Sequence, residues 1–372
     1  KADDLSQILG FFHKFIRKNK FMEAFMAEKY FVASNSGGGF CSYYEGAFDT
    51  RKFSRIYAIK GGSGTGKATF MKDVAREAEK RGYSVRYIYC SSDAQSLDGI
   101  IINEPKIAVL DGTSPHVYEP KTVGAVDSIV NLGAFLDENL LRESRSIIEK
   151  VSLQKQRGFS AAYGYLRAYA SICESIDILV KPAVNMEKLK KNVHRIVENV
   201  QTGQGNEKNL LVRSIGMRGL SSFDTYYERA RIYYEIHDLF DSAHIFMGEI
   251  YSALKERRAD MRISNNPIMP YRLDAVEIEK DGLAFEITNE GREESRTINM
   301  RRFIEGSAAS LIKADYRAAA RVRDSALSLA LAEFEKIKKY HFILEEIYGA
   351  AMDFSAKEEY THHFCNKIFE NN

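Results

Sequence analysis

A glycine-rich segment followed by a lysine is the part of this sequence best suited to binding phosphate. Gly61-Gly-Ser-Gly-Thr-Gly-Lys67 stands between an apolar run, Arg55 to Lys60, and a segment of helical periodicity, Phe70 to Arg81. Between a strand and a helix, glycines let backbone N–H groups converge on phosphate oxygens, and the helix N-terminus adds partial positive charge. We therefore predict a site for a nucleoside triphosphate, above all ATP, with Lys67 on its β- and γ-phosphates; a turn without ligand is the alternative. The expected nucleotide contacts are Gly61, Gly62, Ser63, Gly64, Thr65, Gly66, Lys67, Ala68 and Thr69.

The residue after Lys67 departs from this pattern. A Ser or Thr there normally supplies a hydroxyl to Mg²⁺, but this sequence has Ala68, and Thr69 comes one residue later. Phosphate binding does not require that hydroxyl, whereas ordinary magnesium ligation does. Three explanations stay open: an engineered change, a natural loss of catalysis, or replacement of the hydroxyl by water or by Thr69.

An acidic residue ends the apolar run Lys106 to Asp111, which we predict to be a strand. A carboxylate at the carboxyl end of a strand beside a phosphate loop can organise a magnesium ion through a water. We expect Asp111 to do so, with Thr69 as the other candidate metal ligand. The alternative is that Asp111 only opens a turn with Gly112.

Three more polar residues follow predicted strands at the same sheet edge. Asp93 and Asp98 come after Ser84 to Cys90, in a loop, and could orient a water or an acceptor hydroxyl. His116, five residues past Asp111, could sense the γ-phosphate or act as a base. Ordinary loop hydrogen bonding explains each equally well. The predicted catalytic residues are Lys67, Asp93, Asp111 and His116.

Residues around the phosphate loop recur later in the chain. At a shift of 176 (231 minus 55), Arg55-Ile-Tyr aligns with Arg231-Ile-Tyr, and Phe70-Met71 with Phe246-Met247. Matches continue at a shift of 180 (212 minus 32) upstream and 168 (299 minus 131) downstream. This order and spacing predict two copies of one unit of roughly 170 residues; chance similarity of two αβ segments is the alternative.

The second copy has no phosphate loop. In its place stands His237 to Ala243, without glycine or lysine, and Asp238 and Asp241 would repel phosphate. Ile287 takes the position of Asp111. We predict that residues 209–355 form a pseudo-domain that packs, gates or recognises.

These elements predict an α/β fold: a P-loop-like parallel sheet flanked by helices, duplicated, with helical extensions. The polar segment 201–208 separates a nucleotide-binding domain, 1–200, from a degenerate domain, 209–372. Two long helical patterns, 140–200 and 308–354, are candidates for a cap over the cleft. Arginines that could reach the nucleotide from the first, unless they are solvated, are Arg142, Arg145 and Arg157. Leu5 to Tyr30 predicts an amphipathic helix that packs on the domain.

Composition adds few restrictions. Of 372 residues, 45% are hydrophobic and 28% charged, and the net charge is +2, so nothing indicates nucleic acid as a partner. The four cysteines form no CxxC pair, which predicts reduced thiols in a cytoplasmic protein. No apolar run approaches the ~18–20 residues of a membrane span. We expect a small-molecule or protein partner of unknown identity, and a homo-oligomer is possible.

The chain resembles a family of uncharacterised bacterial P-loop ATPases that look nucleotide-kinase-like and tandemly duplicated. The resemblance covers residues 1–135 and rests on Gly61–Lys67, Cys90–Asp98 and Val109–His116. In that family the second half often looks like a live phosphate loop, whereas here it does not. The resemblance implies the fold and nucleotide binding, and it supplies no substrate.

The function expected from these residues is slow, Mg²⁺-dependent ATP hydrolysis that drives a conformational change. One alternative is a kinase that transfers the γ-phosphate to a small molecule or nucleotide under the helical cap. Another, motivated by Ala68 and the degenerate copy, is a non-catalytic nucleotide sensor or scaffold.

Overall fold

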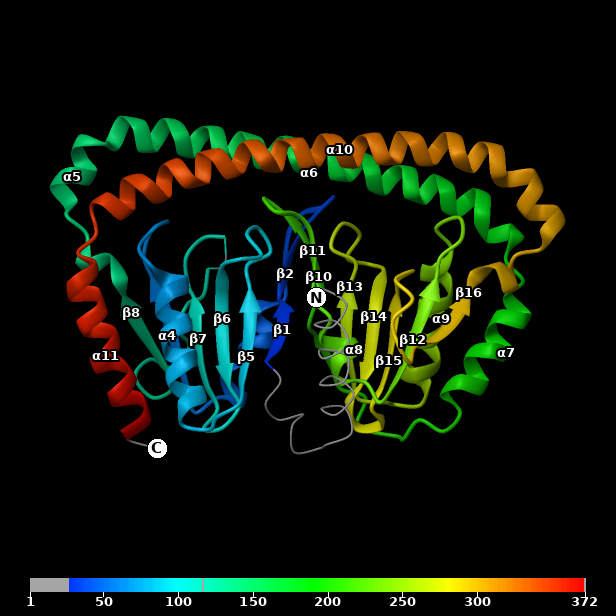
Figure 1. Ribbon diagram of the computed structural model, residues 1–372, viewed down its shortest axis with the longest axis horizontal. Coiled ribbons are helices and arrows are strands. Elements are labelled where there is room, and N and C mark those ends of the chain that lie inside the picture. The colour runs from blue at the N-terminus through cyan, green and yellow to red at the C-terminus, as the bar shows by residue number, and fades with distance from the viewer. Residues whose placement is uncertain (1–26, 116, 371–372) are drawn as a thin grey trace, which may run out of the picture.

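The computed structural model describes residues 27–115 and 117–370 of the 372. It shows an α/β protein in which two six-stranded sheets stand side by side below a pair of long helices (Figure 1). We call the part from β1 to α7 the first half and the part from β9 to α11 the second half. The predicted α/β class and the helices that flank both sheets are confirmed.

The two sheets share one strand order. In the first sheet the order is β1 (Glu28–Phe31), β5 (Val85–Tyr89), β6 (Leu97–Ile102), β7 (Ile107–Asp111), β4 (Arg55–Lys60), β8 (Asp127–Asn131). In the second it is β9 (Glu207–Asn209), β13 (Met261–Asn265), β14 (Leu273–Ile278), β15 (Leu283–Ile287), β12 (Ile232–His237), β16 (Arg296–Asn299). Only β6 and β14 run antiparallel to their neighbours. The sheets are thus mixed and mostly parallel, rather than parallel throughout as predicted.

The strand β6 corrects one prediction. Asp98, expected in a loop, is the second residue of β6, and every residue of that strand is buried. A hairpin also follows the edge strand of each half: β2 (Ala33–Ser36) with β3 (Gly39–Ser42), and β10 (Arg213–Gly216) with β11 (Gly219–Ser222). Short helices complete the units: α3 (Tyr44–Ala47), η1 (Thr50–Lys52), η2 (Leu132–Phe135), α8 (Thr225–Arg229), η4 (Glu279–Asp281) and η5 (Met300–Phe303).

Successive side chains of a strand point to opposite faces of its sheet, so each sheet has a separate hydrophobic core on each face. In the first sheet, Ile59 and Val109 point towards α4 (Lys67–Lys80), whose buried face includes Phe70 and Val74. The opposite face of the sheet, with Ala58 and Ala108, packs on residues of the second half. In the second half α9 (Ala243–Glu256) covers its sheet in the same way.

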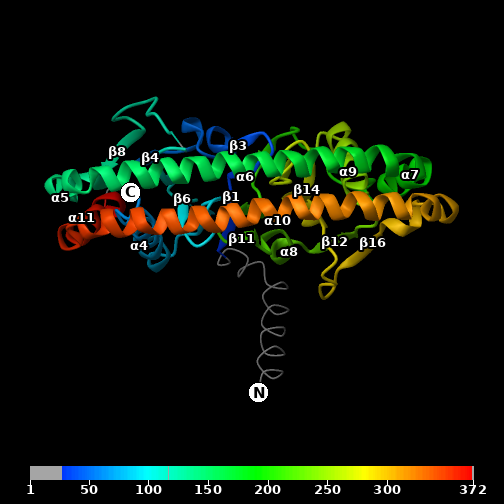
Figure 2. The same ribbon diagram turned by 90° about the horizontal axis from the view of Figure 1, so that it is seen from above.

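Two long helices run antiparallel along the tops of both sheets (Figures 1 and 2). They are α6 (Arg145–Val180), which follows the short α5 (Glu138–Glu143), and α10 (Gly306–Ala350). Their shared core includes Leu166, Phe334 and Ile337, and the helical segments predicted near 140–200 and 308–354 are therefore present. Because one helix comes from each half, the pair joins both.

The helices that follow this pair are exchanged between the halves. After η3 (Lys181–Ala183), α7 (Met186–Val197) belongs to the first half in sequence but packs on α9. Conversely, α11 (Phe354–Glu370) follows α10 and packs on α4. Packing therefore crosses the predicted boundary at 201–208 in both directions.

Reciprocal contacts relate the two halves by a pseudo-twofold axis. Phe31 and Leu211, which are 180 residues apart (211 minus 31), donate backbone hydrogen bonds to each other over 2.7 and 2.9 Å. Two further backbone hydrogen bonds are equivalent to each other: Asp353 N donates to Phe135 O over 2.9 Å, and Asn185 N donates to Phe303 O over 2.7 Å. Such mutual contacts are those of a twofold interface. Residues 231–286 also form strand, helix and strand in the order that duplication requires, so the fold is compatible with two copies.

The register of the strands differs from the sequence alignment by one residue. Tyr57 pairs with Val109, and Tyr234 pairs with Phe285, so that β4 and β12 correspond at a shift of 177 (234 minus 57). The helices α4 and α9 keep the shift of 176 (243 minus 67). The loop between strand and helix is consequently one residue shorter in the second half.

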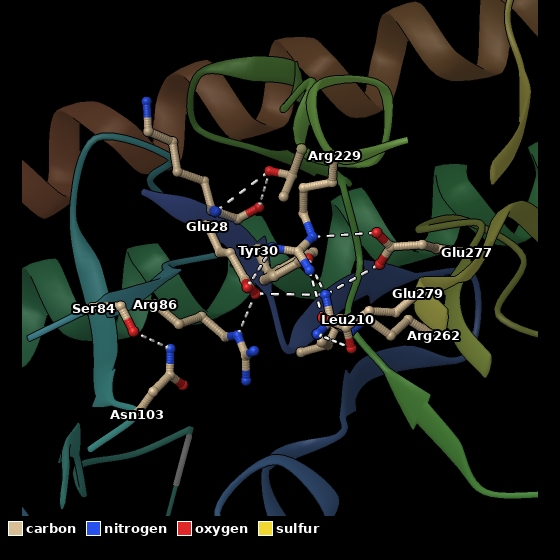
Figure 3. Close-up of polar contacts among 12 residues, drawn as sticks. Glu28, Tyr30, Ser84, Arg86, Asn103, Leu210, Arg229, Arg262, Glu277 and Glu279 are labelled. Carbon is tan, nitrogen blue, oxygen red and sulfur yellow. Dashed lines mark hydrogen bonds and ion pairs between the residues drawn. The ribbon is translucent and has the colours of Figure 1, made fainter. Parts of the chain in front are cut away.

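A charged cluster joins the edge strand β1 to the second half (Figure 3). The Glu28 carboxylate pairs with Arg86 at 2.7 Å and with Arg229 at 2.6 Å. Arg229 and Arg262 both also pair with Glu277, at 3.2 and 3.1 Å. All these side chains are largely buried, so each ion has a partner where water is scarce.

Only the end of the helix predicted over Leu5 to Tyr30 falls within the described residues. Residues 28–31 are the strand β1, which corrects the end of that prediction, and residues 5–26 lie outside the described residues. No helix within 27–115 and 117–370 is long and apolar enough to cross a membrane.

Candidate phosphate-binding site

The predicted glycine loop lies between a strand and a helix. Strand β4 ends at Lys60, and α4 begins at Lys67. Gly64 has φ +75° and Gly66 has φ +77°, which is a backbone region that glycine enters without steric cost. These two glycines allow the chain to curl directly in front of the first turn of α4.

The Lys67 ammonium lies inside this curl. Its Nζ donates to the carbonyl oxygens of Gly61 and Gly62 over 2.9 and 2.8 Å, and it lies 3.6 Å from Asp111 Oδ2. Asp111 reaches this place because β7 ends there, parallel to and beside β4. Sequence analysis predicted this juxtaposition of a loop lysine and a strand-end acid.

Asp111 is a mostly buried carboxylate with local partners. Burial raises its pKa, although Lys67 and hydrogen bonds from Thr113 act in the opposite direction. Thr113 donates to Oδ1 from both its backbone N–H, at 2.9 Å, and its hydroxyl, at 2.5 Å. The Asp111-Gly112 turn given as the alternative role is thus present, while Oδ2 faces Lys67. Such a carboxylate can accept a proton or bind a hydrated cation.

The C-terminal helices cover the glycine loop. A Cβ at Gly64 would lie 2.5 Å from the backbone oxygen of Glu345 in α10, and one at Gly62 would lie 3.1 Å from the Tyr348 ring. At Gly66 the nearest atom is the Lys357 Nζ of α11, 3.5 Å away. The glycines therefore also permit close approach of helices from the second half. This packing role is invisible in the sequence, because the partners are nearly 300 residues away.

A lysine, a histidine and a glutamate form a chain above the loop. Lys155 Nζ of α6 lies 3.0 Å from His341 Nδ1 of α10, and His341 Nε2 lies 3.3 Å from Glu345 Oε1. Burial lowers the pKa of Lys155, and the nearby charge of Lys67 lowers it further. Sequence reasoning missed these residues because they sit in unremarkable helical patterns. Of the arginines it proposed instead, Arg142 and Arg145 form exposed pairs within their own helices, and Arg157 is exposed.

The other predicted residues are dispersed around the loop. Asp93 Oδ1 accepts from Arg218 Nε at 2.9 Å, which is an ion pair to the second half. Asp98 lies on β6, where the hydroxyl of Tyr44 donates to its backbone oxygen over 3.1 Å. Thr69 is exposed on α4, Ala68 packs against the core of the first sheet, and His116 lies outside the described residues.

The residues present fit a magnesium ion only in its hydrated form. Among the described residues, no group of three or more His, Cys, Asp or Glu side chains could hold a metal. Magnesium in nucleotide sites usually keeps several waters and binds one or two carboxylates together with substrate phosphates. Asp111 supplies one such carboxylate beside the loop, which satisfies this requirement.

The corresponding loop of the second half carries its own anion. Between β12 and α9, Asp238 accepts from the backbone N–H of Ala243 at 2.7 Å and of Asp241 at 2.9 Å. A carboxylate of the chain thus occupies the helix N-terminus, a position that favours negative charge. The register places Ile287 opposite Ile236, as Asp111 stands opposite Ile59, so the second half lacks both the loop and the acid.

Compared with family models, with curated proteins and with solved structures, the chain matches none. The resemblance to bacterial P-loop ATPases therefore stays a hypothesis from the sequence.

Proposed function

We propose that this chain is a P-loop ATPase that binds ATP with Mg²⁺ at Gly61–Lys67 and hydrolyses it slowly. The observation that carries the proposal is the position of Lys67, at the first turn of α4 and 3.6 Å from Asp111, at the carboxyl ends of adjacent parallel strands. This is the edge at which open α/β sheets bind ligands. A cation and an acid there can contact a phosphate and its counter-ion.

Each residue of the site has a defined task in the proposal. Lys67 would leave the carbonyls of Gly61 and Gly62 and bind the β- and γ-phosphates, while the loop N–H groups bind the remaining oxygens. A magnesium ion, when bound, would neutralise part of the negative charge on the phosphates. Asp111 would hold that ion through its waters. Arg218 orients Asp93 through Oδ1, so Asp93, with His116 as the other predicted residue, would position the attacking water.

Binding at this loop would also act on the long helices. Gly64 touches the backbone of Glu345, and Lys155 and Lys357 approach the loop from α6 and α11. A triphosphate would attract both lysines and repel the Glu345 carboxylate. Since α10 and α11 follow the second half in sequence, nucleotide binding in the first half would be communicated to the second.

Calorimetric titration with ATP and Mg²⁺ tests the proposal. Lys67→Ala should weaken ATP binding by at least tenfold, or about 1.4 kcal/mol, while the fold persists. The matched control is Lys72→Ala, an exposed lysine on the same helix, which should bind normally. Equal affinity of folded Lys67→Ala and the control would contradict the site. Ala243→Lys should add no second site, because Asp238 already occupies that loop.

A second candidate function is nucleotide sensing without turnover. It is favoured by Ala68, which offers no hydroxyl to a metal, and by the exposure of Thr69 on the outside of α4. Tight ATP binding with no ADP formed in Mg²⁺, Mn²⁺ or Ca²⁺ would favour sensing over hydrolysis. ADP that forms only with an added acceptor would instead support the kinase alternative.

A further inference from the structure

A cavity of about 450 Å³ lies beside the second sheet, away from the phosphate loop, and one of its walls is α7, which comes from the first half in sequence. It lies between α7 and the starts of β12, β15 and β16, so it opens at the amino ends of these parallel strands. The phosphate loop, by contrast, lies at carboxyl ends in the other half. Cavities of roughly 300–1,000 Å³ are typical of small-molecule sites.

The cavity is lined by positively charged and by apolar side chains. Arg195, Arg296 and Arg302 line it, with Asp281 as the acidic residue, so the charge is net positive (three minus one). Within the part of the chain that the structure describes, none of the three guanidinium groups forms an ion pair. The apolar part of the lining consists of Ile196, Val200, Ile232, Leu283 and Ile298, together with the ring of Tyr234.

A buried amide in the wall lacks a partner. Asn192 is 9% exposed, and its Oδ1 has no hydrogen-bond partner among the described residues. Less than 1 Å² of this oxygen is accessible to solvent, so a ligand in the cavity would not reach it unless the Asn192 side chain moved. The three arginines and Asn192 line the same cavity.

The matching place beside the first sheet, where α11 packs, shows what this region looks like when it is filled. At the shift of 168, Asn192 and Ile196 correspond to Tyr360 and Phe364 (360 minus 192; 364 minus 196). Phe364 packs edge-on against Tyr57, with the two ring centroids 4.9 Å apart, and Tyr57 is the counterpart of Tyr234. Where α7 packs on the second sheet, two aromatic side chains are thus replaced by smaller ones, and this leaves room for the cavity.

The charges differ between the halves as well. The counterparts of Arg296, Arg302 and Arg195 are Ser128, Ala134 and His363, in the same order (128, 134 and 363 differ from them by 168). The space and the three arginines thus occur together beside the second sheet, whereas the aligned positions beside the first sheet carry neither an arginine nor the smaller side chains. Packing alone requires neither the arginines nor the empty volume.

We propose that this cavity binds a phosphate monoester that carries an apolar group. Arginine matches phosphate with two parallel hydrogen bonds, which favours phosphate at the rim. The apolar group would cover Ile196 and Leu283, next to the ring of Tyr234. Arg296 is oriented for this task, because it donates to the Tyr234 hydroxyl over 3.1 Å and lies 5.6 Å from the ring centroid.

Phenyl phosphate is a suitable probe, titrated calorimetrically into the full chain with benzoate and inorganic phosphate in parallel. Phenyl phosphate should bind at least tenfold more tightly than either. Arg302→Ala should weaken it tenfold or more, whereas Arg321→Ala, at an exposed arginine on α10 that does not line the cavity, should not. Ile196→Phe, which copies Phe364 of α11, should abolish binding; if that variant does not fold, Arg302→Ala carries the test.

A second set of outcomes separates this cavity from the phosphate loop. Lys67→Ala should leave phenyl phosphate binding unchanged. Binding that is lost in Lys67→Ala but kept in Arg302→Ala would assign the probe to the loop and overturn the proposal. Equal binding of inorganic phosphate, stronger binding of benzoate, or no binding at millimolar concentration would overturn it too.

Discussion

Arg218 donates from Nε to Asp93 Oδ1 over 2.9 Å, and this ion pair connects the hairpin of the second half to the sheet edge of the first. The guanidinium also lies 5.6 Å from the ring centroid of Phe342 in α10. The pair is mostly shielded from water, since Asp93 is only 9% exposed. The Arg218 side chain therefore joins three elements: the hairpin of β10 and β11, the loop after β5, and α10.

We predict that Arg218→Ala lowers the free energy of unfolding by about 1–3 kcal/mol, because a buried carboxylate loses its charged partner. Urea unfolding at pH 7 measures this. Arg142→Ala is the control, since its pair with Glu138 is exposed and should contribute less than about 0.5 kcal/mol. Equal effects of the two variants would show that the pair to Asp93 adds nothing to stability.

The cluster around Glu28 predicts a pH dependence of stability. Burial alone would raise the pKa of Glu28, but Arg86, Arg262 and Arg229 together lower it to about 2, from 4.5. Because the folded-state pKa lies below the unfolded value, the stabilisation is fully present above pH 4.5 and is lost as the pH falls towards 2. A shift of this size corresponds to about 3 kcal/mol.

Glu28→Gln isolates that contribution. Its unfolding free energy should be lower than wild type by about 3 kcal/mol at pH 7, and the gap should close as the pH falls below 4.5. Burial raises the pKa of Glu277, a contribution of opposite sign that both proteins share. Asp49→Asn is the control: Arg51 lowers the pKa of Asp49 to about 2, but the Arg51 side chain is 87% exposed, so water screens the pair and it should matter little. A gap that stays constant from pH 7 to 3 would contradict the prediction.

The sequence predicted the part of the site that is local. The run from Arg55 to Arg81 contains its own strand, glycines and helix, and the apolar strand before Asp111 ends beside it, as the pattern indicated. Lys155, His341 and Glu345 had no such signal, because a helical pattern does not say which distant loop its residues will face. The exchange of α7 and α11 was equally hidden, since the apolar face of a helix does not indicate against which sheet it will pack.

The missed strand has a different cause. Leu97 to Ile102 contains only three consecutive apolar residues, Ile100 to Ile102, because Asp98 and Gly99 interrupt its start, and it follows directly on the mostly polar residues from Ser91 to Ser96. Glycine at position 99 of β6 makes room for Phe48, whose ring would lie only 2.8 Å from a Cβ at that position. That fit depends on tertiary packing.

The contact between Gly64 and α10 can be measured by adding one methyl group. Gly64→Ala places a Cβ against the Glu345 backbone and also strains a residue with φ +75°, so we expect a loss of about 2–4 kcal/mol in unfolding free energy. Gly82→Ala is matched, because φ is +84° but no atom lies within 4 Å of the added Cβ. Its cost should be about 1 kcal/mol.

Hydrogen exchange locates the effect of that substitution. In Gly64→Ala, amides in the last turns of α10 should exchange faster, while those of α9 should not change. Equal stability of Gly64→Ala and Gly82→Ala, with unchanged exchange in α10, would show that the loop does not support this helix.

Ala68 gives the sharpest test of the chemistry. It is the second residue of α4, next to Lys67, and it is partly buried against the core of the first sheet. The hydroxyl usual at this position is one of the oxygen ligands of an octahedral magnesium ion. If the proposed site is correct, alanine leaves that place to a water, so the ion would be bound less firmly, while Lys67 and the loop amides would still bind phosphate.

We therefore predict that Ala68→Ser tightens Mg²⁺-dependent ATP binding by on the order of tenfold, or about 1.4 kcal/mol, and raises turnover. Binding in EDTA should change little, because phosphate contacts remain the same. Thr69→Ala is the control: its exposed side chain should affect neither quantity. ATP hydrolysis across a magnesium titration checks all three proteins. Identical curves for wild type and Ala68→Ser would mean that water already replaces the hydroxyl, whereas a loss in Thr69→Ala would assign that role to Thr69.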